Sequence, residues 1–275
     1  MLNKLFQIEK LKTLNYKAFK TIVILHALLF FLVVTVASSF KVHVQGITIE
    51  KLFFFPYVWN TLAWFASWFN LLLGIVAIML VTNEFQYRTF RKQLIDGLTR
   101  NELLTGKLLV FLLLAAYTML LVFLSGLIFG IIKSPSFSIE NFINGFTFLP
   151  VLYVQALAYM LLAMLFAFIF RNTAFSILAF ILYFFPVEPI LRAFMPDSIT
   201  KFMPVKLISN LTPMPDFVGI SLSDAIQFSG QGGEGALAFG LVQKTMPLIL
   251  SAGITIAYCL LFVYISKLIV QYKNF

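Results

Sequence analysis

Residues 83–107 carry the side chains whose types and spacing best indicate a chemical role. Aromatic and arginine residues alternate there with acids, and uncharged apolar stretches enclose the segment on both sides. Aromatic and arginine side chains commonly supply the binding energy of protein–protein interfaces. The segment therefore predicts a surface that binds another protein. Its candidate contact residues are Glu84, Phe85, Tyr87, Arg88, Thr89, Phe90, Arg91, Leu94, Asp96, Gly97 and Arg100.

A surface helix is predicted over residues 84–96. Tyr87, Phe90 and Leu94 recur at helical spacing and fall on one face. We expect Glu84 to lie among the exposed residues and the aromatic side chains to anchor the partner. An ordinary membrane-surface loop with an interfacial helix would show a similar pattern, so this alternative stays open.

A second helix is predicted to follow almost at once. Gly97 is typical of the position just past a helix, because glycine adopts the left-handed conformation without strain. Thr99 and Glu102 have the spacing of a capping box, in which each side chain accepts a hydrogen bond from the other residue's backbone amide. The surface helix should therefore be joined rigidly to the next apolar stretch.

Catalytic chemistry is not indicated within this chain. The one Gly-Lys pair, at residues 106–107, has Asn101 where a phosphate-binding loop needs glycine and Leu108 where it needs serine or threonine. The serines of the apolar stretches have no histidine or aspartate spaced to activate them. We therefore expect no ATP site, no intramembrane active site and no metal site in this chain.

The composition is that of a membrane protein. Of the 275 residues, 61% are hydrophobic and 11% are charged, whereas soluble domains carry about 25% charged residues. Helices of about 20 apolar residues can cross a bilayer. The sequence predicts an all-α integral membrane protein with a single transmembrane domain over residues 1–275. Its expected parts are an interfacial amphipathic helix over 1–17, six spans at about 18–40, 56–82, 108–132, 146–170, 173–191 and 245–267, and an outer segment with short helices over 188–244.

The distribution of basic residues predicts the orientation. Lysine and arginine favour the cytoplasmic side of membrane proteins. If both termini are cytoplasmic, the whole formal net charge of +9 lies on that side. We expect a multi-pass protein of the bacterial cytoplasmic (inner) membrane whose basic side contacts anionic lipids, and no binding of nucleic acid.

Two titratable residues fall within or beside the spans. His26 lies inside the first span, where we expect a hydrogen-bonded packing residue. Glu188 lies at the outer rim of the fifth span, where we expect it to face Arg192 or solvent. An ion-coupled secondary transporter would use such groups. This class of transporter and a non-transport membrane scaffold subunit are the alternative functions.

Aromatic residues mark the start of the second span. An aromatic belt at the outer membrane surface is predicted from the cluster of Phe53, Phe54, Phe55, Tyr57 and Trp59. Trp64 and Trp68, one and two turns deeper, are expected to pack between helices. The 33 phenylalanines of the chain are a weak indication of a hydrophobic or amphipathic cargo.

The connecting segment resembles that of a known family, the membrane subunits (permeases) of ABC transporters of the type-2 exporter class. The resemblance covers the six-span topology and a short motif between spans two and three. The matching residues are Glu84, Arg88-Thr89, Leu94, Gly97, Arg100 and Gly106-Lys107. The resemblance implies that residues 84–96 form a coupling helix and that residues 188–244 dip back toward the membrane.

The resemblance also implies the partners. A permease of this class pairs with a separate cytoplasmic ATP-binding cassette subunit, which holds the ATP and magnesium. Two copies, or this chain and a related permease, would form the translocation pathway. The chain is thus expected to be the permease subunit of an ATP-driven exporter that is moved by its partner through helix 84–96.

Overall fold

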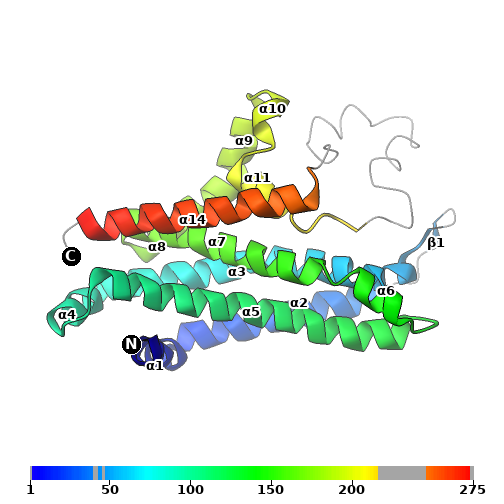
Figure 1. Ribbon diagram of the computed structural model, residues 1–275, viewed down its shortest axis with the longest axis horizontal. Helices are drawn as coiled ribbons and strands as arrows, with labels where there is room; N and C mark the ends of the chain where they lie inside the picture. Colours follow the sequence, from blue (N-terminus) through cyan, green and yellow to red (C-terminus); the bar gives the residue numbers. More distant parts are fainter. Residues whose placement is uncertain (1, 40–42, 45–46, 216–245, 273–275) are drawn as a thin grey trace.

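The protein is a bundle of long helices. A computed structural model describes residues 2–39, 43–44, 47–215 and 246–272. The long helices lie side by side, with the short helices α1 and α4 at one end of the bundle and α6 at the other (Figure 1). We call these the α4 end and the α6 end.

The six predicted spans are confirmed. Six helical segments of the described residues are long and apolar enough to cross a membrane. An all-α integral membrane protein is therefore the correct fold class. The segments are α2 (Lys17–Ser39), α3 (Tyr57–Gln86), α5 (Arg100–Lys133), α6 with α7 (Ile139–Asn144 and Phe148–Phe170), α8 continuing through η2 into α9 (Thr173–Leu182, Tyr183–Val187 and Glu188–Ala193), and α14 (Leu248–Tyr272).

Shorter elements join the spans. The remaining ones are α1 (Leu2–Asn15), β1 (His43–Val44) paired antiparallel with β2 (Ile47–Thr48), η1 (Ile49–Phe53), α4 (Thr89–Ile95), α10 (Asp197–Thr200) and α11 (Pro204–Ser209). Helices α9 and α10 stand out from one side of the bundle (Figure 1). Most of the predicted outer segment, residues 216–244, and the predicted start of the sixth span at 245 lie outside the described residues.

Helix α7 is the centre of the bundle and contacts α3, α5, α8 and α14. Ala77 of α3 and Ala156 and Ala163 of α7 are fully buried. Small residues let helix backbones approach closely within a membrane. At Gly74 of α3, an added Cβ would lie 2.9 Å from the ring of Phe180. Side chains therefore fill the space between α3, α7 and α8.

The predicted aromatic belt is wrong for three of its five members, whereas Tyr57 is 48% exposed and Phe54 is half-buried. Phe53, Phe55 and Trp59 are buried, because α6 and the end of α5 cover them. Trp59 stacks on Phe123 with ring centroids 6.0 Å apart, and its indole nitrogen donates a hydrogen bond to the Phe142 carbonyl oxygen at 3.0 Å.

The two deeper tryptophans also differ from the prediction. Trp68 is 63% exposed and does not pack between helices of this chain, whereas Trp64 is half-buried beside it. The helical period alone does not say which face of a span meets a neighbouring helix.

The aromatic cluster gives a sharp test of the packing. An added Cβ at Gly126 of α5 would lie 2.4 Å from the Trp59 ring. We expect Gly126→Ala to destabilise the protein by about 1–3 kcal/mol, as overpacking of a filled core usually does. Gly253→Ala on α14 is the matched control, because an added Cβ there meets no atom within 4 Å. Equal thermal midpoints for both variants in detergent would contradict this packing.

The fifth span bends where Pro186 lies within the π-helical turn η2. Of the two environments predicted for Glu188, exposure to solvent is wrong, because its side chain is fully buried, whereas an electrostatic interaction with Arg192 is present. Its two carboxylate oxygens accept hydrogen bonds from the backbone amides of Val205 and Lys206 at 2.8 and 2.7 Å. Glu188 therefore holds the first turn of α11 against the span, which a linear sequence does not reveal.

His26 lies where a packing residue was expected. It is fully buried between α2, α3 and α5, and its Nδ1 lies 3.5 Å from the Tyr117 hydroxyl. The ring also meets Phe69 edge-on, with centroids 6.5 Å apart. These contacts support the prediction of a hydrogen-bonded packing residue.

Candidate functional site

The segment between α3 and α5 forms the tip of the α4 end (Figure 1). Helix α3 continues to Gln86, so Glu84 and Phe85 belong to the last turn of a span. Arg88 then adopts the left-handed conformation with a φ of 54°, and α4 begins at Thr89. The predicted single helix over 84–96 is therefore wrong in its extent: it is a helix end, a break and a helix of 7 residues.

The structure divides the predicted contact residues by exposure. Glu84 and Phe90 are buried, which corrects the expectation that they face a partner. Phe90 packs against Phe85 and Phe168, with ring centroids 4.9 and 6.3 Å away. The exposed members are Tyr87, Arg88, Arg91, Asp96 and Gly97, and the half-buried ones are Phe85, Thr89, Leu94 and Arg100. Gln86, Lys92 and Ile95 join the exposed surface, with Ile95 being 78% exposed.

The predicted junction between α4 and α5 is confirmed. Gly97 has a φ of 96°, which is the left-handed region that glycine tolerates. The Glu102 amide donates to Thr99 Oγ1 at 3.3 Å, and the Thr99 amide donates to Glu102 Oε2 at 2.6 Å. These reciprocal hydrogen bonds fix the first turn of α5 relative to α4.

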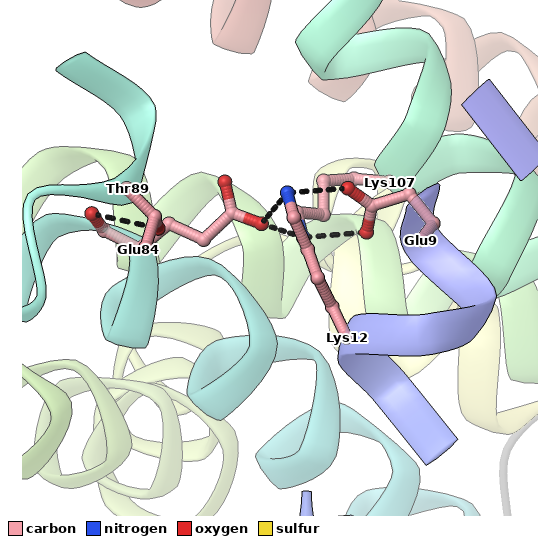
Figure 2. Close-up of polar contacts among 5 residues, drawn as sticks. All are labelled: Glu9, Lys12, Glu84, Thr89 and Lys107. Carbon is pink, nitrogen blue, oxygen red and sulfur yellow. Dashed lines mark hydrogen bonds and ion pairs between the residues drawn. The ribbon is translucent and has the colours of Figure 1, made fainter. Parts of the chain in front are cut away.

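Four charged side chains from three helices meet beneath α4, and we call them the charge tetrad: Glu9, Lys12, Glu84 and Lys107. Figure 2 shows the side chains of Lys12 and Lys107 reaching between the carboxylates of Glu9 and Glu84. Lys107 Nζ lies 2.7 Å from Glu9 Oε2 and also pairs closely with Glu84 Oε1. Lys12 Nζ lies 3.1 Å from Glu9 Oε1 and 3.2 Å from Glu84 Oε1. The tetrad thus ties α1 to the end of α3 and the start of α5.

Three members of the tetrad are buried, Lys12 is partly exposed, and the four charges balance. Lys107 is 2% exposed, and Glu9 and Glu84 are nearly as inaccessible. Burial alone would raise the pKa of Glu9, but the ammonium groups of Lys107 and Lys12 outweigh it and hold that pKa below its usual range. A lowered pKa stabilises the fold at neutral pH, and this contribution is lost as the pH falls through the folded-state value.

Sequence reasoning missed three members of the tetrad, Glu9, Lys12 and Lys107, because only Glu84 was among the predicted site residues. Lys107 stood in the family motif without a partner, and Glu9 is an acid in an otherwise basic leading helix. A lone acid among lysines, and a lysine two turns inside a span helix, both point to buried pairing. Which charges pair cannot be read from the sequence, because Glu9 and Lys107 are 98 positions apart.

Arg100 binds the end of the last span. Its Nη1 donates to the Val270 carbonyl oxygen at 3.0 Å and to that of Gln271. Carbonyl groups at a helix C-terminus lack partners within the helix and carry partial negative charge. Arg100 therefore ties α14 to the first residue of α5, beside the α4 junction.

Two grooves flank α4. One, of about 350 Å³, lies between α3, α4 and the α7–α8 turn, and we call it the arginine groove because Arg88, Arg91 and Arg171 line it. The other, of about 550 Å³, lies between α1 and α4. Within the described ranges, no three His, Cys, Asp or Glu side chains are grouped so that they could hold a metal ion.

Comparison with known proteins adds one match. A family model described as ABC-2 family transporter protein matches residues 5–187. The matched range runs from α1 through the fifth span and includes the whole charge tetrad and the α3–α4–α5 connection. No curated protein matches the chain.

Proposed function

Since this chain belongs to the ABC-2 family of transporter proteins and is thus an ABC transporter permease, we propose that it is the permease subunit of an ATP-driven exporter. It works with a separate ATP-binding cassette subunit, which holds the ATP and magnesium. The α4 end faces the cytoplasm, with both termini on that side of a bacterial inner membrane.

The exposed tip at α4 is the observation that carries this proposal. Tyr87 is 75% exposed and Ile95 is 78% exposed, and Arg88 and Arg91 lie between them. Apolar, aromatic and arginine side chains on a rigid projection are typical of a protein contact site. Because α4 is joined to α3 and α5 by short turns, a displacement of α4 by the ATP-binding subunit also displaces both spans.

Two copies, or this chain and a related permease, form the translocation pathway in this proposal. Buried side chains fill the contacts of α7 with α3, α5 and α14. A conduit is therefore better placed between two bundles than within one. The exporter direction follows from the resemblance of the α3–α4–α5 connection to type-2 exporters.

The ion-coupled alternative finds no support at its best candidate residue. A carboxylate that carries protons or sodium must be able to release its partners during transport. Glu188 instead accepts hydrogen bonds from two backbone amides that begin α11. These contacts support a structural role for Glu188.

Cysteine cross-linking tests the location of the ATPase contact. Cys259 is buried, and Cys259→Ala leaves a chain without other cysteines. In that background, Ile95→Cys at the α4 end should cross-link to the ATP-binding subunit in membranes. Phe137→Cys, which is 62% exposed near the α6 end, should not. Cross-linking through residue 137 alone, or no ATP-binding subunit purifying with the wild type, would contradict the proposal.

A further inference from the structure

We propose that the arginine groove binds the headgroup of an anionic phospholipid. The groove is lined by three arginines that come from separate elements: Arg88 from the α3–α4 break, Arg91 from α4 and Arg171 from the α7–α8 turn. Guanidinium groups bind phosphate oxygens through paired hydrogen bonds. The family match assigns no ligand to this groove, and the proposed ATPase contact uses Arg88 and Arg91 but not Arg171.

The charge of the groove is strongly positive despite the presence of Glu84 in its wall. Glu84 is already matched, because the tetrad contains two carboxylates and two ammonium groups in direct contact. The charge of Glu84 therefore does not cancel that of the arginines that line the groove. A ligand with a phosphate group would be attracted to this site.

The backbone at two of these arginines supports a role for the side chains. Arg88 and Arg171 both have a φ of 54°, in the left-handed region. A glycine would form each turn without steric strain, so turn geometry does not require arginine at either place. Arg171 is also held in position, because its guanidinium carbon lies 5.3 Å from the centre of the Phe85 ring.

The position of the groove favours a lipid over a soluble anion. Arg171 lies between the ends of two spans, and its neighbours Phe170 and Phe175 are 46% and 62% exposed. Apolar side chains at a membrane surface can contact acyl chains while arginine holds the headgroup. Inorganic phosphate has no apolar part that could contact these phenylalanines.

Native mass spectrometry of the purified full-length chain tests the proposal. Dioleoyl phosphatidylglycerol titrated into the detergent solution should bind the wild type with an affinity that falls about tenfold in Arg171→Gln, the effect expected for loss of one charge-assisted contact. Lys267→Gln on α14 is the matched control, since it removes an exposed basic residue outside the groove. It should bind the lipid as the wild type does.

Two further titrations distinguish an anionic lipid from other possible ligands of the groove. Dioleoyl phosphatidylcholine, whose headgroup carries no net charge, should bind at least about tenfold more weakly than phosphatidylglycerol. Inorganic phosphate should not compete at equal concentration. If phosphate competes fully, or if phosphatidylcholine binds equally well, the anionic-lipid assignment is wrong.

A second groove variant covers the case in which Arg171→Gln does not fold. If Arg171→Gln does not fold, as judged by circular dichroism, Arg91→Gln on exposed α4 provides the same loss of lipid affinity. Unchanged lipid affinity in a folded groove variant would overturn the proposal. Arg171→Gln should retain the ATP-binding subunit, so a failure of the lipid site and a failure of the ATPase contact give different results.

Discussion

Lys107→Met is expected to destabilise the folded protein by about 3–5 kcal/mol. Lys107 is the most deeply buried charge of the tetrad and contacts both Glu9 and Glu84. Methionine fills a similar volume but leaves two carboxylates close together in a buried site with only the partly exposed Lys12. Removing one partner of a buried ion pair costs about this much, because the remaining charge is uncompensated. Unfolding in mixed detergent micelles measures the change.

A second substitution shows whether charge is the cause. In Lys107→Met/Glu84→Gln the tetrad loses one charge of each sign, and Glu9 keeps its contact with Lys12 at 3.1 Å. This double variant should be more stable than Lys107→Met alone. Lys92→Met, on the exposed face of α4, should change the free energy of unfolding by less than about 0.5 kcal/mol. Additive effects of the two tetrad substitutions would show that the ions do not act as a unit.

Reversing the charge of both exposed arginines at the tip should separate the permease from its ATP-binding subunit. Arg88→Glu/Arg91→Glu is expected to weaken that association by at least about 30-fold, because loss of a buried charge pair at an interface costs about 2–5 kcal/mol. Co-purification and ATPase stimulation measure the effect. Phe90→Ala is not a substitute, because Phe90 is buried and its loss would disturb packing.

The control for this variant carries the same change in net charge. Lys10→Glu/Lys267→Glu reverses two exposed lysines outside α4 and should retain the association. Basic residues also direct membrane insertion. Labelling of an added Ile95→Cys substitution shows whether each variant keeps its orientation in the membrane. If both double variants bind the ATP-binding subunit equally, α4 is not the contact surface.

Features that depend on neighbours in the sequence were predicted correctly. The Gly97 turn and the capping box of Thr99 and Glu102 lie within six residues, and the structure shows both. The predicted spans 146–170 and 173–191 leave only Arg171 and Asn172 between them, and these two residues form the turn, with the Asn172 side chain accepting a hydrogen bond from the Phe175 amide. Six apolar stretches sufficed to predict six spans because the bilayer sets their length.

Features that depend on packing were missed. Glu84 was expected at the surface because its immediate neighbours are polar, yet Lys107, 23 positions away, pairs with it. Phe90 matches the exposed face by period, but Phe168 of α7 covers it. Trp59 and Glu188 were placed at membrane rims, whereas α6 and α11 bury them. In each case the deciding contact comes from a separate helix, whose placement no local pattern specifies.

The contact of Arg100 with the carbonyl groups of Val270 and Gln271 helps in choosing label positions for measuring conformational change. Glu9, near the beginning of the chain, is bound to α5 as well. We therefore expect α1 and the end of α14 to move together with α5 and to keep a nearly constant separation. Fluorophores attached beside Glu9 and Gln271 would report a fixed distance throughout a transport cycle. This pair provides a reference distance. A third label at Phe137 would then measure how far the α6 end moves relative to the α4 end.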